Sequence, residues 1–265
     1  MACVAALTWG VLIEPGRLVV RHEELELPHW PRPLSGLRVA LLSDLHVGAP
    51  FWGVEQLSTL VERTNAEQPD LILLGGDYLV GSEPGATPVP AEAIAEKLSA
   101  LHAPLGVLAV LGNHDWDDGQ VRRAFEQRGI RVLEDERVRL ERARQEFWVV
   151  GLADQITRRS EPRKAVSGVP PNAPFLLLVH EPDVFESFGR LRIRPSLTLA
   201  GHTHGGQVML PLVGRPVVPS EFGRRYAYGH VVEEGRHLFV TSGVGTSILP
   251  VRFLVPPEIA ILTLR

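Results

Sequence analysis

Five short apolar runs in this sequence each lead into residues that can bind a metal ion. Apolar runs of this length are typical of buried strands. A buried strand has no packing reason to finish so often in an ionisable residue, so we interpret the five endings as parts of one site. The runs cover residues 37–42, 71–74, 107–111, 175–179 and 197–200, and the residues that follow them are Asp44, His46, Asp77, Asn113, His114, His180, His202 and His204.

Helical patterns separate the first three of these runs. Apolar residues recur at helical spacing over 54–61 and 94–101, and a third helix is expected at about 119–128. This alternation predicts an α/β fold of stacked layers, with mostly parallel strands at the centre and helices outside. In such sheets, sites gather at the carboxyl ends of the strands. Further strand patterns occupy 17–27, 130–133, 137–141, 147–151, 226–232, 236–241 and 258–264.

Length and composition restrict the class of protein. The chain has 265 residues, of which 45% are hydrophobic, so it is long for one domain and short for two. We expect an apolar segment and edge strands over 1–36, followed by a single compact domain over 37–265. The net charge of -4 makes nucleic acid an unlikely main partner. The single cysteine, Cys3, excludes a cysteine-rich metal site, so His, Asp and Asn must hold any metal.

The first thirteen residues are apolar apart from Thr8. This stretch is shorter than the roughly 20 residues that a membrane-spanning helix needs. Since no Lys, Arg or twin-arginine pair precedes it, it is a poor export signal. Two alternatives remain open: the stretch packs on the domain, or it rests in a membrane surface. We expect a cytoplasmic or peripheral membrane location.

The candidate ligands favour a centre of two metal ions. Seven oxygen and nitrogen ligands are too many for one tetrahedral ion, and a set without thiolate suits Mn, Fe, Zn, Co or Ni. His202 and His204 can face one site only where the chain turns, which the glycines at 201, 205 and 206 permit. Paired metal ions stabilise both the attacking and the leaving oxygen at phosphorus. The set therefore predicts phosphoester hydrolysis.

The order of these motifs resembles the calcineurin-like metallophosphoesterases, and within that family a bacterial branch of membrane-associated phosphodiesterases. The family pattern D-x-H, G-D-x-x-D, G-N-H-D/E, H and G-H-x-H is matched by Asp44-Leu45-His46, Gly76-Asp77, Gly112-Asn113-His114-Asp115, His180 and Gly201-His202-Thr203-His204. The resemblance implies an α/β/β/α sandwich of two mixed sheets flanked by helices. The sequence departs from the family pattern at Val80, which stands where the second Asp of G-D-x-x-D is usual. We expect altered support of the site there rather than loss of metal.

The resemblance also implies roles for individual residues. One metal would be held by Asp44, His46, Asp77 and His204, and the other by Asp77, Asn113, His180 and His202. Asp77 is then the bridge, and Mn is the expected metal. A metal-bound hydroxide would attack phosphorus. His114 would help to protonate the leaving oxygen, and Asp115 would orient its ring.

The substrate is less constrained than the reaction. Phe51 and Trp52 follow the first motif and Arg215, Arg224 and Arg225 follow the last, which suits a lipid-linked phosphodiester or diphosphate. UDP-2,3-diacylglucosamine is one candidate, and peripheral membrane contact is expected. The alternative is that the two aromatic residues cap a helix and the arginines are solvated. A broad phosphomonoesterase and a non-catalytic metal-binding scaffold also remain possible, whereas the H-x-H-x-D-H motif of a metallo-β-lactamase is absent.

Overall fold

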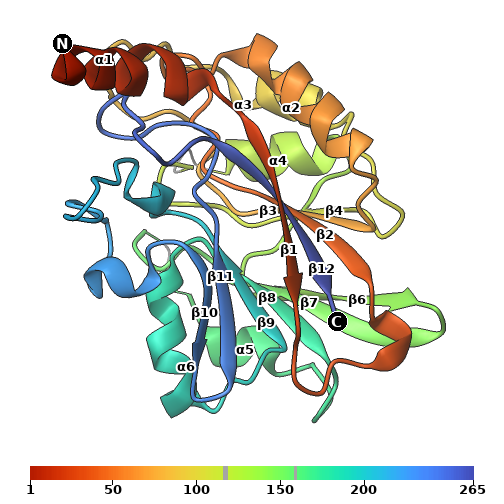
Figure 1. Cartoon of the computed structure of the whole chain (residues 1–265). Helices are drawn as coiled ribbons and strands as arrows, with labels where there is room; N and C mark the ends of the chain where they lie inside the picture. Colours follow the sequence, from red (N-terminus) through yellow and green to blue (C-terminus); the bar gives the residue numbers. More distant parts are fainter. Residues whose placement is uncertain (116–118, 158–159) are drawn as a thin grey trace.

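Two mixed sheets form the centre of the computed structural model, which describes residues 1–115, 119–157 and 160–265 (Figure 1). In the first sheet, β2, β3, β4 and β5 are parallel, β12 is antiparallel to β2, and β1 is parallel to β12. In sheet order, its strands are β1 (Val19–Leu25), β12 (Glu258–Leu264), β2 (Leu37–Leu42), β3 (Leu71–Leu74), β4 (Val107–Ala109) and β5 (Arg131–Val132). Residues 17–27 were expected to contain an edge strand, and β1 confirms it.

The second sheet is built on the same plan. Its central strands β11, β9, β8 and β7 are parallel, while β10 and β6 pair antiparallel at the two edges. In sheet order, the strands are β10 (Gly229–Glu233), β11 (Arg236–Val240), β9 (Leu197–Ala200), β8 (Phe175–Leu178), β7 (Gln145–Gly151) and β6 (Glu136–Arg142). The expected strand over 226–232 begins later than predicted, because residues 223–226 form a 3₁₀ turn.

Helices cover the outer face of each sheet (Figure 1). The first sheet carries α2 (Val54–Ala66), α3 (Ala91–Leu98) and α4 (Gln120–Gln127), and the second carries α5 (Pro162–Val166) and α6 (Phe185–Leu191). Together with the two sheets, these helices confirm the expected α/β/β/α sandwich.

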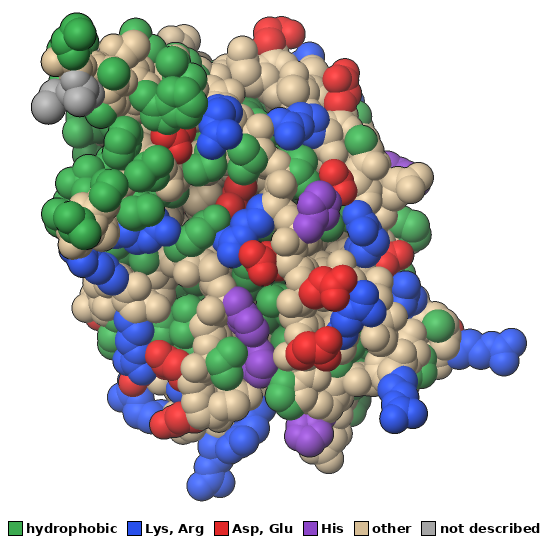
Figure 2. Space-filling view, viewed as in Figure 1, with side chains coloured by type: hydrophobic (Ala, Val, Ile, Leu, Met, Phe, Trp, Pro, Cys, Tyr) green, Lys and Arg blue, Asp and Glu red, His purple; other side chains and the backbone are tan. Residues whose placement is uncertain are grey.

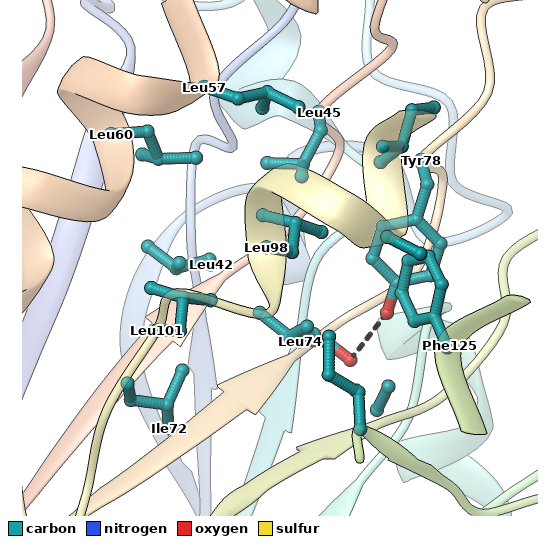
Figure 3. Packing of buried hydrophobic residues seen from close by; sticks show 14 of the residues in the cluster. Leu42, Leu45, Leu57, Leu60, Ile72, Leu74, Tyr78, Leu98, Leu101 and Phe125 are labelled. Carbon is teal, nitrogen blue, oxygen red and sulfur yellow. Dashed lines mark hydrogen bonds between the residues drawn. The ribbon is translucent and has the colours of Figure 1, made fainter. Parts of the chain in front are cut away.

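Alternating side chains along each strand divide the core into layers. In β2, Ala40 and Leu42 face the helices, whereas Val39 and Leu41 face the second sheet. Figure 3 shows the helix side, where Leu42 and Leu74 lie among side chains of α2, α3 and α4. The buried Tyr78 hydroxyl donates a hydrogen bond to the Leu74 carbonyl at 3.1 Å. Both faces of the sheet are therefore sealed by packing, which leaves the strand ends as the place for polar chemistry.

The first thirteen residues form a helix that rests on the C-terminal region. The helix α1 (Ala2–Thr8) continues through a wider turn over Trp9–Ile13. The Gly10 carbonyl accepts the backbone N–H of Arg252 at 3.0 Å, and the Glu14 carboxylate accepts that of Leu254 at 2.9 Å. Within the described ranges, no helix has both the length and the apolar character to cross a bilayer. The helical, packed form of this segment agrees with one of the two alternatives.

Candidate metal centre

The polar residues at the strand ends meet at one edge of the two sheets. Both sheets run their central strands in parallel, so the carboxyl ends of β2, β3 and β4 face the same edge, as do those of β8 and β9. Backbone hydrogen bonds join the turns, from the Asp44 N–H to the Gly76 carbonyl at 2.9 Å and from the Gly201 N–H to the His180 carbonyl at 3.0 Å. Residues far apart in the sequence are thereby fixed beside one another.

The turns hold unusual backbone conformations. Left-handed φ angles occur at Asp44 (55°), His46 (41°), Asp77 (55°), His202 (67°) and His204 (50°). Such angles are uncommon outside glycine and are retained where the surrounding structure enforces them, often at functional sites. These turns follow the ends of β2, β3 and β9.

Two groups of side chains form around the edge. In the first, His46 Nε2 lies 3.1 Å from His204 Nε2, and His204 Nε2 lies 3.5 Å from Asp44 Oδ1. In the second, His180 Nε2 lies 3.2 Å from Asp77 Oδ2, and His202 Nδ1 lies 3.3 Å from His180 Nε2.

Asp77 connects the two groups. Its Oδ2 lies 3.6 Å from His46 Nε2 as well as 3.2 Å from His180 Nε2. One carboxylate oxygen therefore faces ring nitrogens of both groups.

Burial controls the charge of these groups. It lowers the pKa of His46 and of His202 to about 4 each, which keeps both imidazoles neutral, the form that binds a cation. Burial also raises the pKa of Asp44 to about 6. Asp77 and His180 behave as a pair: against the effect of burial on each, the attraction between them lowers the pKa of Asp77 and raises that of His180.

The donor atoms fit divalent transition-metal ions. The His180 Nδ1 donates to the Gly75 carbonyl at 2.7 Å, which leaves Nε2 to face the cluster. The Nε2 atoms of His46 and His204 face each other at 3.1 Å, with a carboxylate oxygen of Asp77 near the first and one of Asp44 near the second. Asn113 Oδ1 is buried and, among the described residues, has no hydrogen-bond partner. Imidazole nitrogens, carboxylates and one amide oxygen are a donor set for Mn, Fe or Zn.

His114 and Asp115 differ in their contacts. The His114 backbone N–H donates to Asp77 Oδ1 at 2.8 Å, and its ring stands edge-on to that of His46, with centroids 4.8 Å apart. The Asp115 carboxylate is 1% exposed and accepts four backbone N–H groups. They belong to Gly112, Asp77, Tyr78 and Leu79. We expected Asp115 to orient the His114 ring, but its described hydrogen bonds instead hold two loops together.

A cavity of about 750 Å³ opens onto the centre. One side carries Asp77, Asn113, His114, His202 and His204. Ser82, Glu83 and Thr203 also line the cavity. The rest of the wall is mostly apolar and comes from two segments, 206–219 and 247–251, with Val208, Pro216, Val217, Ile248, Leu249 and Val251 among its lining residues.

Of the aromatic and basic residues expected at the rim, Phe51, Trp52 and Arg225 are engaged elsewhere, whereas Arg215 lies beside the cavity and donates to the Gly205 carbonyl. Trp52 is buried, and its indole donates to the Pro15 carbonyl at 2.9 Å, while Phe51 lies close to Gly16. The alternative of a structural role just before α2 fits them better. Arg225 pairs with Glu233 at 2.6 Å, and so is not free for a substrate.

Comparison with known proteins identifies the family. Residues 37–206 match the family model for calcineurin-like phosphoesterases, which covers more than half of the chain. The chain belongs to the calcineurin-like phosphoesterase family. It is therefore a metal-dependent phosphoric ester hydrolase whose potential metal-binding groups cluster at one sheet edge.

Several relatives align with this phosphoesterase along most of their length. Phosphodiesterase YaeI of Escherichia coli is 32% identical, covering 95% of this chain and 90% of that protein. The uncharacterized metallophosphoesterase YkuE of Bacillus subtilis is 28% identical, covering 96% and 87%. UDP-2,3-diacylglucosamine pyrophosphatase LpxG of Chlamydia trachomatis is 26% identical, covering 98% and 93%.

Two residues of the phosphoesterase's site escaped the sequence analysis. Glu83 lies beside His46 and His114, and nothing in the Pro/Gly-rich loop around it signals this place. Arg252 is fully buried behind the centre, and its guanidinium donates to the carbonyls of Ser242, Gly245 and Val255. A lone arginine within the apolar stretch 248–255 was a signal that could have indicated it.

Proposed function

We propose that this protein is a phosphodiesterase or pyrophosphohydrolase that uses two divalent transition-metal ions, with Mn as the native metal. The observation that carries the proposal is the position of Asp77, whose Oδ2 faces ring nitrogens of both side-chain groups. Asp44, His46, Asp77 and His204 would hold one ion, and Asp77, Asn113, His180 and His202 the other. When bound, the ions supply positive charge to the phosphoryl group and lower the pKa of water.

His114 is proposed to act as the proton donor. It lines the cavity beside Asn113 and is tied through its backbone N–H to Asp77. An imidazole ring at this position can give a proton to the leaving oxygen as the bond to phosphorus breaks. Asp115 contributes by holding the loops that carry Asp77 and His114 at a fixed distance.

The substrate is proposed to be lipid-linked. The apolar wall formed by 206–219 and 247–251 adjoins the ligand residues, so one cavity combines a phosphate-handling end with an apolar end. A diester or diphosphate with acyl chains matches both ends, and UDP-2,3-diacylglucosamine is one such compound. Nucleic acid fits poorly, because the net charge of the chain is -4.

Peripheral membrane contact is part of the same proposal. Exposed apolar side chains occur on the cavity wall at Ile248 and Leu249, at Leu254, and at Leu7 and Leu12 of the N-terminal helix. Backbone hydrogen bonds of Arg252 and Leu254 join this helix to the same C-terminal segment. Figure 2 shows hydrophobic side chains gathered over this side of the molecule, where Figure 1 places α1. A bilayer surface would cover these side chains and present acyl chains to the cavity. In this proposal the site belongs to one compact domain over 37–265, on which 1–36 rests.

The test is a substrate panel with the metal-depleted protein before and after addition of Mn. We expect no hydrolysis without metal, and with Mn a higher kcat/KM for diacylated diphosphates than for matched compounds without acyl chains. A preference for phosphomonoesters would favour the broad monoesterase instead. Bound metal without turnover of any ester would favour the scaffold.

A further inference from the structure

Glu83 is a buried carboxylate with unused hydrogen-bonding capacity beside the metal centre. Its side chain is 4% exposed. Among the described residues, its Oε2 has no hydrogen-bond partner, and neither has the buried Nδ1 of His46 nearby. Buried polar atoms are nearly always satisfied, so two unsatisfied atoms side by side call for an explanation.

The two nitrogens of His46 face different surroundings. Its Nε2 faces His204 and Asp77 inside the cluster, whereas its Nδ1 lies 3.8 Å from Glu83 Oε1. This distance is too long for a hydrogen bond, but a small side-chain rotation would close it. A histidine that binds metal through one nitrogen commonly donates its other N–H to a carboxylate or carbonyl. His180 follows this pattern with the Gly75 carbonyl, and Glu83 is placed to do the same for His46.

Glu83 also lies next to the ring of His114. Donor atoms of His46, Glu83 and His114 all lie within 4.8 Å of one another. A Cβ added to Gly81 would lie 2.8 Å from His114 Nδ1 and 3.2 Å from Glu83 Oε2, so both atoms border the same glycine. Asp115 is occupied by backbone N–H groups, and Val80 is apolar with a methyl group facing Gly48. Glu83 is therefore a carboxylate placed close to this ring.

We propose that Glu83 positions both histidines. In this arrangement, Oε1 accepts the Nδ1–H of His46, which fixes the tautomer whose Nε2 lone pair faces the cluster. Oε2 accepts the Nδ1–H of His114, so the ring presents its Nε2–H to the leaving oxygen. That proton passes to the leaving oxygen as the bond from oxygen to phosphorus breaks, while the Nδ1–H stays on His114 and remains hydrogen-bonded to Glu83. This role rests on the proposed function, in which His46 is a ligand and His114 the acid.

The experiment compares Glu83→Gln, Glu83→Asp and the exposed control Glu92→Gln. Mn affinity is measured by competition with a chelating dye, stoichiometry by elemental analysis at saturating Mn, and hydrolysis on paired aryl and alkyl diesters. We expect Glu83→Gln to keep two ions at saturation but to bind Mn about 10- to 100-fold more weakly. It should also slow the alkyl ester more than the aryl ester. Glu83→Asp should retain more Mn affinity than Glu83→Gln, because it keeps the charge.

Three results would overturn the role. Unchanged Mn affinity and an unchanged alkyl-to-aryl ratio in Glu83→Gln would make Glu83 a bystander. Loss of one ion at saturating Mn would make it a metal ligand. If Glu83→Gln, which keeps the shape of the side chain, bound Mn more tightly than Glu83→Asp, Glu83 would act through packing and not through its charge. The proposed function fails separately, if the unsubstituted protein binds fewer than two ions or hydrolyses neither ester.

Discussion

Asp77 and His114 touch each other, yet the two residues are assigned different tasks. Asp77 Oδ2 faces His46 and His180, while its Oδ1 accepts the His114 backbone N–H. The Asp77 side chain is thus committed to the metal groups and to the backbone of its neighbour. The ring of His114 does not take part in these bonds and lines the cavity.

Substitutions at these two positions should have different effects on metal content and on hydrolysis rates. Asp77→Asn removes charge from the proposed bridge, so metal content and the rates on all esters should fall together. His114→Ala should leave metal content near normal and slow alkyl esters by about 10²–10⁴-fold, while aryl esters, which leave readily, should lose less. Elemental analysis and paired ester kinetics check both. An empty site in His114→Ala, or equal slowing of both esters, would contradict the role of a non-ligand acid.

Substitution of Arg252 should lower the stability of the protein. Its guanidinium satisfies three backbone carbonyls in a fully buried position, and burial lowers its pKa to about 10. Arg252→Met would leave these carbonyls unpaired, so we expect the free energy of unfolding to drop by about 3 kcal/mol. Urea denaturation measures the change, with Arg190→Met as the exposed control. A drop equal to that of the control would show that water replaces the guanidinium without cost.

At the scale of elements, the N-terminal helix has one buried and one exposed side. Gly10 lies against the backbone of Arg252 and the ring of Phe253, and a larger residue would crowd this contact. On the other side, Leu7 is 67% and Leu12 is 63% exposed. Apolar side chains of this size gain about 1.5–3 kcal/mol each when fully buried. Contact of this exposed side with an apolar surface would therefore be favourable.

The double variant Leu7→Glu/Leu12→Glu should weaken binding to phosphatidylcholine vesicles several-fold. Membrane binding would then require two charged side chains to leave water. The fold should be unaffected, because the helix packs on the domain through its opposite side. Co-sedimentation with vesicles measures the bound fraction. Val232→Glu, which changes an exposed valine on β10, serves as the control and should bind like the unsubstituted protein. Equal and negligible binding by all three proteins would remove the membrane proposal.

At the scale of the whole molecule, the metal centre joins the two halves of the sandwich. Asp44, His46 and Asp77 come from the first sheet, and His180, His202 and His204 from the second. Ions that bind all of these residues would bind only the folded state, in which both sheets are assembled. Binding of such ions would consequently be coupled to folding.

Mn should therefore raise the melting temperature of the metal-depleted protein. At a concentration of 100 times Kd, each site adds about 2.7 kcal/mol, which corresponds to roughly 5–10 °C for a chain of this size. Differential scanning calorimetry across a Mn series measures the shift, and Asp77→Asn should show a smaller one. A melting temperature that stays constant where activity saturates would contradict binding across the two sheets.

The sequence alone determined the layered fold and the residues that gather at the sheet edge. Apolar runs with helices between them permit few arrangements, and a parallel sheet brings strand ends together whatever its exact register. Asp44, Asp77, Asn113, His180 and His204 could be selected for this reason. The family resemblance added the pattern of motifs.

Only the tertiary structure decided the surroundings of these residues. Glu83 and Arg252 reach the centre from loops whose paths depend on packing rather than on a repeating pattern. The cavity wall comes from segments 206–219 and 247–251, instead of from Phe51 and Trp52. The Asp115 carboxylate accepts three N–H groups of the neighbouring loop and one of its own loop, and these contacts depend on how the two loops pack. Local periodicity shows where a strand ends, but contacts between distant segments form only when the whole chain has folded.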